Sequence, residues 1–127
     1  MKACYVDTSA LLAVAFNEAG APAVAGRLRS FGRLIASNLL EAEFRSALIR
    51  EGIAEGADAI LSMMTWVYPD RPLTPEFSRI LRLGRIRGAD LWHIACALFL
   101  APEVKGLSFI TLDPAQRDLA RRLGFTV

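Results

Sequence analysis

The fold class follows from the stretch Ala3-Cys-Tyr-Val-Asp-Thr-Ser9. Its apolar run stops abruptly at Asp7, which is typical of a strand that is buried on both faces. Helical spacing of apolar residues begins at once and continues over 8–17. The same pattern returns near the end of the chain, where a strand expected at 107–112 is followed by a helix at 114–123. A strand that leads directly into a helix is the repeating unit of parallel α/β sheets.

Apolar runs and amphipathic helices also alternate between these two units. The other expected elements are a helix at 21–31, a strand at 33–36, a helical hairpin of 38–50 and 53–66, an irregular segment or edge strand at 67–73, helices at 75–87 and 90–100, and a terminal strand at 125–127. This alternation predicts an α/β fold with a parallel sheet covered on both faces. We find no internal repeat and no linker, so residues 1–127 are expected to form one domain.

Composition narrows the class of protein. Of the 127 residues, 54% are hydrophobic and 22% are charged, as in a globular protein with a substantial core. The net charge of +2 says little about partners, but all the basic residues except Lys2 and Lys105 are arginines. Arginine suits phosphate and carboxylate ligands, although a GC-rich genome gives the same bias.

Redox state and location are inferred from the cysteines and the apolar runs. Cys4 and Cys96 are far apart in apolar surroundings, which indicates neither a zinc site nor a disulfide framework. Asp7 interrupts the signal-peptide-like run near the N-terminus, and the apolar stretch at 91–101 is about half as long as a membrane span. We therefore expect a reduced, cytoplasmic protein with no membrane segment.

Two aspartates directly follow strands and directly precede helices. Asp7 ends the first apolar run, and Asp113 lies in Phe109-Ile-Thr-Leu-Asp-Pro114. Since the carboxyl ends of parallel strands meet at one edge of a sheet, where ligands bind, both side chains are expected at that edge. Taken singly, each aspartate is better explained as the N-cap of its helix, and Pro114 at the first helical position fits that second interpretation.

Asp90 also opens an expected helix, in Gly88-Ala-Asp-Leu-Trp-His-Ile94. Capping is again the simpler interpretation. His93 lies one turn later on the same side of that helix. A histidine beside Trp92 and Ile94 is more often a packed or hydrogen-bonded core residue than a ligand, and its alternative role is to orient Asp90.

Two glutamates in the helix expected at 38–50 differ in their helical neighbours. Glu41 has Arg45 four residues later, which is the favourable order for a solvated surface pair. Glu43 has no basic residue three or four positions away on its side of the helix, and it lies at the margin of the apolar face. Partly burying a carboxylate without a partner is costly unless a charge or a metal compensates. Glu43 is therefore the better candidate for a site, against the alternative of an edge residue whose carboxylate reaches solvent.

Carboxylates that converge on one pocket repel each other, and a divalent cation relieves that repulsion. Oxygen ligands without a matching set of cysteines and histidines point to Mg²⁺ or Mn²⁺ rather than to zinc. Such a metal can activate a water and neutralise charge on a phosphodiester. A metal-free acyl hydrolase is a poor alternative, because the chain has one histidine and no Gly-x-Ser-x-Gly turn. An aspartate-nucleophile phosphatase usually has a second acid two residues after the first, where this chain has Ser9.

The four acidic segments together resemble the PIN-domain family, and more narrowly the VapC-type toxins of toxin–antitoxin pairs, over essentially the whole chain. The segments that carry the resemblance are Val6-Asp-Thr-Ser-Ala-Leu11, Ala36-Ser-Asn-Leu39 with Glu43-Phe-Arg45, Asp90-Leu-Trp-His-Ile-Ala-Cys-Ala-Leu98, and Ile110-Thr-Leu-Asp113 with 120–124. The register of the second segment selects Glu43 over Glu41. Each segment alone is weak evidence, whereas all four in this order are fairly specific.

The resemblance implies a three-layer α/β/α sandwich with a central, mostly parallel sheet. It also implies a Mg²⁺- or Mn²⁺-dependent endoribonuclease that is inhibited by a cognate antitoxin protein. Asp7 and Asp90 would be the principal metal ligands, and Asp113 would be an outer or second-metal ligand. Glu43 would be a further ligand or the group that positions water, and Thr8 would hydrogen-bond at the site. We also expect a homodimer.

Two questions stay open at this stage. The arginines that precede the Asp90 helix would either contact the RNA backbone or form a solvated helix face; they are Arg79, Arg82, Arg85 and Arg87. The function has alternatives too, namely a housekeeping PIN nuclease in RNA maturation, or a catalytically silent module that binds RNA or protein. The complete acidic set argues against the silent module.

Overall fold

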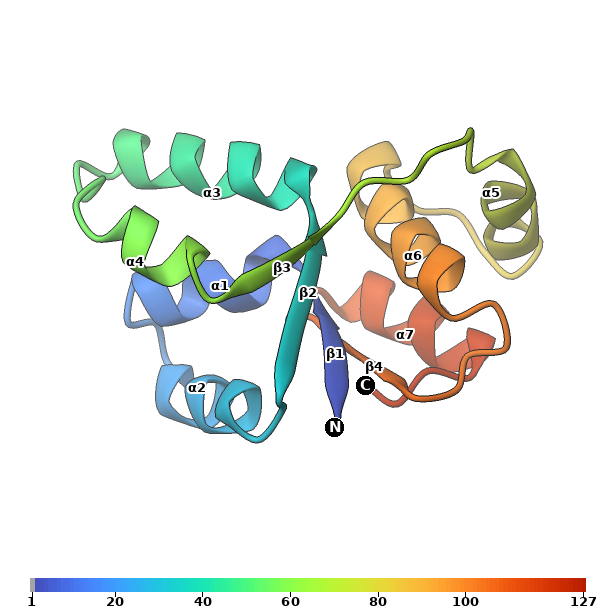
Figure 1. Ribbon diagram of the computed structural model, residues 1–127, viewed down its shortest axis with the longest axis horizontal. Coiled ribbons are helices and arrows are strands. Elements are labelled where there is room, and N and C mark those ends of the chain that lie inside the picture. The colour runs from blue at the N-terminus through green and yellow to red at the C-terminus, as the bar shows by residue number, and fades with distance from the viewer. Residues whose placement is uncertain (1) are drawn as a thin grey trace.

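The computed structural model describes residues 2–127 and confirms the expected α/β class. Within these residues four strands form one parallel sheet in the order β3-β2-β1-β4, with helices on both faces (Figure 1). The strands are β1 (Ala3–Val6), β2 (Arg33–Ser37), β3 (Met64–Val67) and β4 (Leu107–Ile110). The helices are α1 (Thr8–Ala15), α2 (Ala21–Arg29), α3 (Asn38–Arg50), α4 (Ala57–Leu61), α5 (Thr74–Leu81), α6 (Gly88–Leu100) and α7 (Pro114–Leu123).

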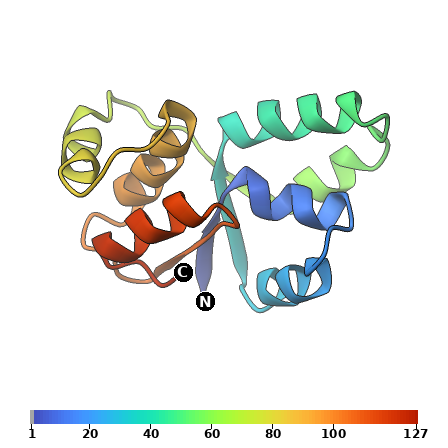
Figure 2. The ribbon, with the colours of Figure 1, turned by 180° about the vertical axis from the view of Figure 1, so that it is seen from behind.

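The helices divide into two layers by their order in the chain. Helices α1 to α4 cover one face of the sheet and α5 to α7 cover the other, as the front and rear views show (Figure 1; Figure 2). This is the expected three-layer α/β/α sandwich. Alternate residues of β1 supply the two cores, because successive side chains of a strand point to opposite faces. Cys4 and Val6 pack in the first core, and Tyr5 packs in the second, stacked on Phe109 with ring centroids 5.5 Å apart.

Strand β1 is the centre of the sheet, and its two neighbours run parallel to it. Tyr5 lies opposite Ile35 of β2 on one side and opposite Phe109 of β4 on the other. The backbone N–H of Asp7 donates to the carbonyl oxygen of Ile110 over 2.9 Å, which extends this ladder by one residue. The carboxyl ends of the strands, and the segments that follow them, therefore meet at one edge of the sheet.

The prediction of a helix over 53–66 is wrong. That segment contains only the short α4, which begins after Gly56 in a left-handed conformation (φ +86°) and ends at Leu61. Met64–Val67 forms β3 and pairs in parallel with β2, so the edge strand lies there and not at 67–73. Threonine, tryptophan and valine favour strands, and the pairing that β2 offers overrides a helical periodicity.

Several element boundaries also differ from the expected ones, most of all around α5, α6 and the end of the chain. Helix α5 ends at Leu81 rather than at 87, and α6 begins at Gly88 rather than at 90. The terminal strand is reduced to a single bridge between Thr126 and Ser108. The loop after α5 contains Gly84, where a Cβ atom would lie 2.9 Å from Cδ2 of the buried Leu119, so glycine allows this loop to pack closely on α7.

Cys4 and Cys96 are buried, unbonded thiols. They belong to the cores on opposite sides of the sheet, which keeps them from bonding to each other. Burial raises the pKa of both thiols to about 12, so both stay protonated at neutral pH.

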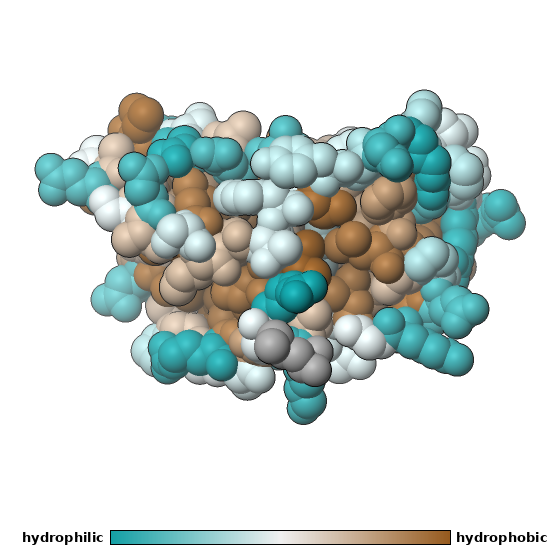
Figure 3. Space-filling view, in the orientation of Figure 1, coloured by the Kyte–Doolittle hydropathy of each residue, from teal (hydrophilic) through white to brown (hydrophobic). Residues whose placement is uncertain are grey.

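Hydrophilic side chains are concentrated around the rim of the molecule, and hydrophobic ones lie nearer its middle (Figure 3). The most exposed large apolar side chains are those of Ile49, Tyr68 and Met63. Within residues 2–127, no helix combines the length and the apolar character needed to cross a membrane.

Alanine substitutions at two glycines should change the free energy of unfolding in opposite directions. Gly124 ends α7 at φ +110°, where an L side chain is strained, so Gly124→Ala should lower the free energy of unfolding by about 1–2 kcal/mol. Gly26 lies inside α2, and a Cβ there would have its nearest neighbour at 3.9 Å. Gly26→Ala should therefore raise the free energy of unfolding by about 0.5–1 kcal/mol. Urea unfolding of both variants and the parent measures the two effects, and a shift of the same sign in both would contradict the assigned backbone conformations.

Candidate active site

Four carboxylates reach one cleft at the carboxyl edge of the sheet. Asp7 follows β1, Glu43 lies in α3, Asp90 lies in α6, and Asp113 directly precedes α7. The cleft has a volume of about 370 Å³. Its lining also includes Thr8, Ser9, Arg50 and Arg87. The structure therefore brings together all four acidic residues that the sequence singled out.

Asp7 is buried and uses one oxygen for the protein. Its Oδ2 accepts hydrogen bonds from the backbone N–H of Ser9 (3.2 Å), the Ser9 hydroxyl (2.6 Å) and the Thr111 hydroxyl (3.0 Å). The bond from the Ser9 N–H makes Asp7 the N-cap of α1, as the capping interpretation proposed. Its Oδ1 accepts no hydrogen bond within residues 2–127 and lies 3.8 Å from Nε2 of His93. Capping thus leaves one oxygen of Asp7 for another partner.

Glu43 and Glu41 differ as the helical spacing predicts. Glu41 accepts a hydrogen bond from Nε of Arg45 over 2.8 Å on the surface of α3. Glu43 turns toward the cleft, and its Oε1 accepts from the Thr8 hydroxyl and contacts Nε2 of His93, both at 2.8 Å. The expected hydrogen bond of Thr8 is therefore present. The bond to His93, more than that to Thr8, holds the pKa of Glu43 below its usual value, against the opposing effect of burial.

Asp90 is not the N-cap of its helix, which corrects the expectation from the sequence. Because α6 begins at Gly88, Asp90 occupies the third helical position, and its carboxylate accepts from Arg87 over 3.4 Å. Partial burial raises the pKa of Asp90, and the nearby charges of Asp7 and Asp113 raise it further. The attraction of Arg87 lowers the pKa without reversing the rise. Asp90 is thus the carboxylate at which the repulsion within the cleft is apparent.

Asp113 caps α7 and belongs to a polar network that sequence reasoning missed. Its Oδ1 accepts from the backbone N–H of Gln116 over 2.9 Å. The buried Gln116 donates from Nε2 to the carbonyl oxygen of Asp90 (3.2 Å), and its Oε1 lies 2.7 Å from the Thr111 hydroxyl. An available signal was the spacing Asp113-Pro-Ala-Gln116, which resembles a capping box. Gln116 and Thr111 connect Asp113, Asp90 and Asp7 through the protein.

His93 is a buried, hydrogen-bonded residue, as the simpler interpretation proposed. It does not orient Asp90. Its Nε2 lies against Glu43 and its Nδ1 lies 2.9 Å from the hydroxyl oxygen of Tyr5. The role of Tyr5 could not be inferred from the sequence beyond the general need of a buried tyrosine hydroxyl for a partner.

The four arginines before α6 do not form one helix face. Arg79 lies in α5 and donates to the carbonyl oxygen of Pro102, whereas Arg85 and Arg87 follow the end of that helix. Of the four, Arg87 lines the cleft. Arg50, from the last turn of α3, is a second basic residue in the lining and was not singled out from the sequence.

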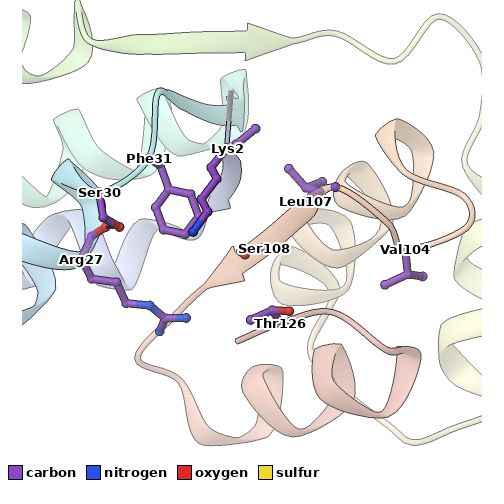
Figure 4. A pocket seen from close by; sticks show the side chains of 10 residues that line it. Lys2, Arg27, Ser30, Phe31, Val104, Leu107, Ser108 and Thr126 are labelled. Carbon is purple, nitrogen blue, oxygen red and sulfur yellow. Dashed lines mark hydrogen bonds between the residues drawn. The ribbon is translucent and has the colours of Figure 1, made fainter.

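A second hollow, of about 570 Å³, lies at the amino-terminal edge of the sheet. Lys2, Arg27 and Phe31 stand on one side of it, and Ser108 and Thr126 on the other (Figure 4). The residues that line it include no aspartate or glutamate. The acidic cleft is therefore the candidate for a metal-dependent site, although within residues 2–127 no three His, Cys, Asp or Glu side chains form a ready-made metal site.

The fold and the cleft define a class of α/β proteins with acidic residues gathered at the carboxyl edge of a parallel sheet. The chain belongs to the PIN domain family, whose model matches residues 4–122. Proteins of this family are generally nucleases, often metal-dependent ribonucleases. The resemblance seen in the sequence is confirmed at the level of this family. Among curated proteins, no match to the chain is found.

Asp90→Asn should stabilise the metal-free protein at pH 7. A carboxyl whose pKa is higher in the folded than in the unfolded protein costs stability once it is ionised, and this cost disappears below its ordinary value of 3.8. The gain in free energy of unfolding should therefore shrink as the pH falls from 7 toward 4. Chelator-treated protein unfolded in urea at several pH values measures this gain.

The matched control is Asp70→Asn, which changes an exposed aspartate and should stay within about 0.5 kcal/mol of the parent. A loss of stability in Asp90→Asn at pH 7 would contradict the electrostatic conflict assigned to the cleft.

Proposed function

We propose that this protein is a metal-dependent endoribonuclease that hydrolyses RNA phosphodiester bonds as the toxin of a toxin–antitoxin pair. The supporting observation is the acidic cleft, in which four carboxylates from four separate segments of a PIN domain line one hollow. Like charges repel, so unrelated surface acids have no reason to gather in this way.

The oxygen donors of the cleft fit a hard divalent cation. Oδ1 of Asp7 and Oε2 of Glu43 accept no hydrogen bond from the residues that the structure describes, so each carboxylate has an oxygen for a ligand. The repulsion that Asp7 and Asp113 exert on Asp90 is the kind that a cation relieves. Carboxylate donors without cysteine suit Mg²⁺ or Mn²⁺.

The four acidic residues and the two arginines of the cleft have different roles in this activity. Asp7 and Asp90 are the principal metal ligands, Glu43 completes the set or positions water, and Asp113 is an outer ligand. When bound, the cation supplies an activated water and neutralises charge on the phosphodiester. Arg50 and Arg87, which line the same cleft, bind phosphates of the RNA backbone.

The biological part of the proposal rests on the resemblance of the acidic segments to VapC-type toxins. It comprises a cognate antitoxin protein that blocks the cleft, a cytoplasmic location, and a homodimer as the working unit.

The RNA cleavage activity of variants should distinguish the roles of Glu41 and Glu43 in α3. The parent protein should cut RNA with Mg²⁺ or Mn²⁺ and stop in EDTA, and Glu43→Gln should abolish this activity because the amide carries no charge for the cation. Glu41→Gln is the matched control: it removes an exposed pair with Arg45, costs at most a few tenths of a kcal/mol of stability, and should keep the activity. Gel analysis of a labelled RNA with each variant provides the measurement. Undiminished cleavage in EDTA would refute the metal dependence, and an inactive Glu41→Gln beside an active Glu43→Gln would refute the assignment of Glu43.

The toxin role should be visible in growing cells. Induced expression of the chain without a partner should arrest growth, whereas the Asp7→Asn variant, which still has a capping side chain, should not. Growth curves and immunoblots of both variants measure the effect at matched protein levels. Unimpaired growth beside RNA cleavage in vitro would favour a housekeeping nuclease, and unimpaired growth with no cleavage would favour a silent binding module.

A further inference from the structure

A chain of hydrogen bonds runs from β1 through α6 to Glu43. The Tyr5 hydroxyl lies 2.9 Å from Nδ1 of His93, and Nε2 of the same ring lies 2.8 Å from Oε1 of Glu43. The backbone N–H of Ser37 donates to the Tyr5 oxygen over 3.2 Å. Tyr5 and His93 are 0% and 1% exposed, so bulk water does not compete for these bonds.

The protons of this chain follow from its donors and acceptors. The Tyr5 oxygen accepts from the Ser37 N–H, and the Tyr5 hydroxyl proton can be donated to Nδ1 of His93 when that nitrogen carries no hydrogen. The neutral ring then carries its hydrogen on Nε2 and donates it to Glu43. An imidazolium would donate from Nε2 as well. A neutral ring protonated on Nδ1 would instead set a nitrogen lone pair against the Glu43 carboxylate at 2.8 Å, which is repulsive.

We propose that Tyr5 and His93 are positioning residues that hold Oε1 of Glu43 on the protein side and leave Oε2 for a cation in the cleft. This inference rests on the proposed function. The Thr8 hydroxyl donates to the same Oε1 over 2.8 Å, whereas Oε2 accepts no hydrogen bond within residues 2–127.

The hydrogen bond from Thr8 alone would not fix the Glu43 carboxylate relative to Asp90, and the position of His93 explains why. A glutamate side chain has three rotatable bonds, and that of Glu43 keeps 34% of its surface exposed. Thr8 belongs to α1, in the same helical layer as α3, whereas His93 belongs to α6 in the other layer (Figure 1). The bond from His93 therefore fixes Glu43 relative to the helix that carries Asp90, and ligands of one cation need such a fixed separation.

The ¹⁵N spectrum of His93 tests the hydrogen-bond chain without any metal. His93 is the single histidine of the sequence, so its ring signals need no assignment by mutation. The metal-free parent should show hydrogen on Nε2, and Tyr5→Phe, which keeps the aromatic ring and removes the hydroxyl, should shift population toward the other tautomer. A parent ring protonated on Nδ1 alone would overturn the proposal.

Calorimetric titration of the metal-free protein with Mg²⁺ tests the positioning role. His93→Leu should weaken Mg²⁺ binding by about 10- to 100-fold, the usual loss when the partner of a metal ligand is removed. His93→Gln, whose amide can still donate toward Glu43, should recover part of the affinity, and Tyr5→Phe should lose less than His93→Leu. Phe109→Leu is the matched control, because it disturbs the ring stacked on Tyr5 and removes no bond of the chain. Its affinity should match that of the parent.

The outcomes separate the two proposals. Equal Mg²⁺ affinity in His93→Leu and the parent, or an equal loss in Phe109→Leu, would overturn the positioning role while the proposed function stands. A parent that binds no Mg²⁺ would overturn the metal-dependent function and with it the role of Oε2, whatever tautomer the ¹⁵N spectrum shows.

Discussion

The strands of this sheet run in one direction, and the places of three of the four acidic side chains in the cleft follow directly from it. Strand β1 pairs in parallel with β2 and β4, so the segments that leave these strands emerge at the same edge. Asp7 leaves β1 there, α3 brings Glu43 from β2, and Asp113 leaves β4. If either neighbour of β1 were antiparallel, one of these acids would lie at the opposite edge, in the hollow that contains Lys2 and Arg27. Burial of apolar residues stabilises the sheet, whereas the direction of its strands determines which side chains meet at its carboxyl edge.

Within the cleft, the hydrogen bonds that the described residues make to Asp7 and to Glu43 fall on one oxygen of each carboxylate. Oδ2 of Asp7 accepts the cap bond of α1, and Oδ1 does not take part in it. Glu43 follows the same arrangement, with Oε1 bound by Thr8 and His93. The capping interpretation and the site interpretation of such an aspartate are therefore compatible. Several hydrogen-bond donors surround Oδ2, and these bonds offset the cost of burying the Asp7 side chain.

The sequence predicted those features that depend on local spacing or on strand order. Glu41 could be assigned to the surface because Arg45 follows at i+4, and Glu43 stood out because no such partner exists. The partners of His93 could not be predicted, since Glu43 lies 50 positions away and Tyr5 lies 88 positions away in the chain. Strand β3 was missed for a related reason: the pairing of Met64–Val67 with β2 decides its conformation, and that pairing is a tertiary contact.

The division of the helices into two layers by chain order has a consequence for biosynthesis. The layer of α1 to α4 comes from residues before β3 and contributes Asp7 and Glu43, whereas Asp90 and Asp113 come from residues after it. A chain from which β4 has not yet emerged and paired with β1 has Asp7, Glu43 and Asp90 but lacks Asp113 at the carboxyl edge of the sheet. Under the proposed function, the nascent protein therefore has an incomplete metal site, because Asp113 is made after β4 and after the other three acids.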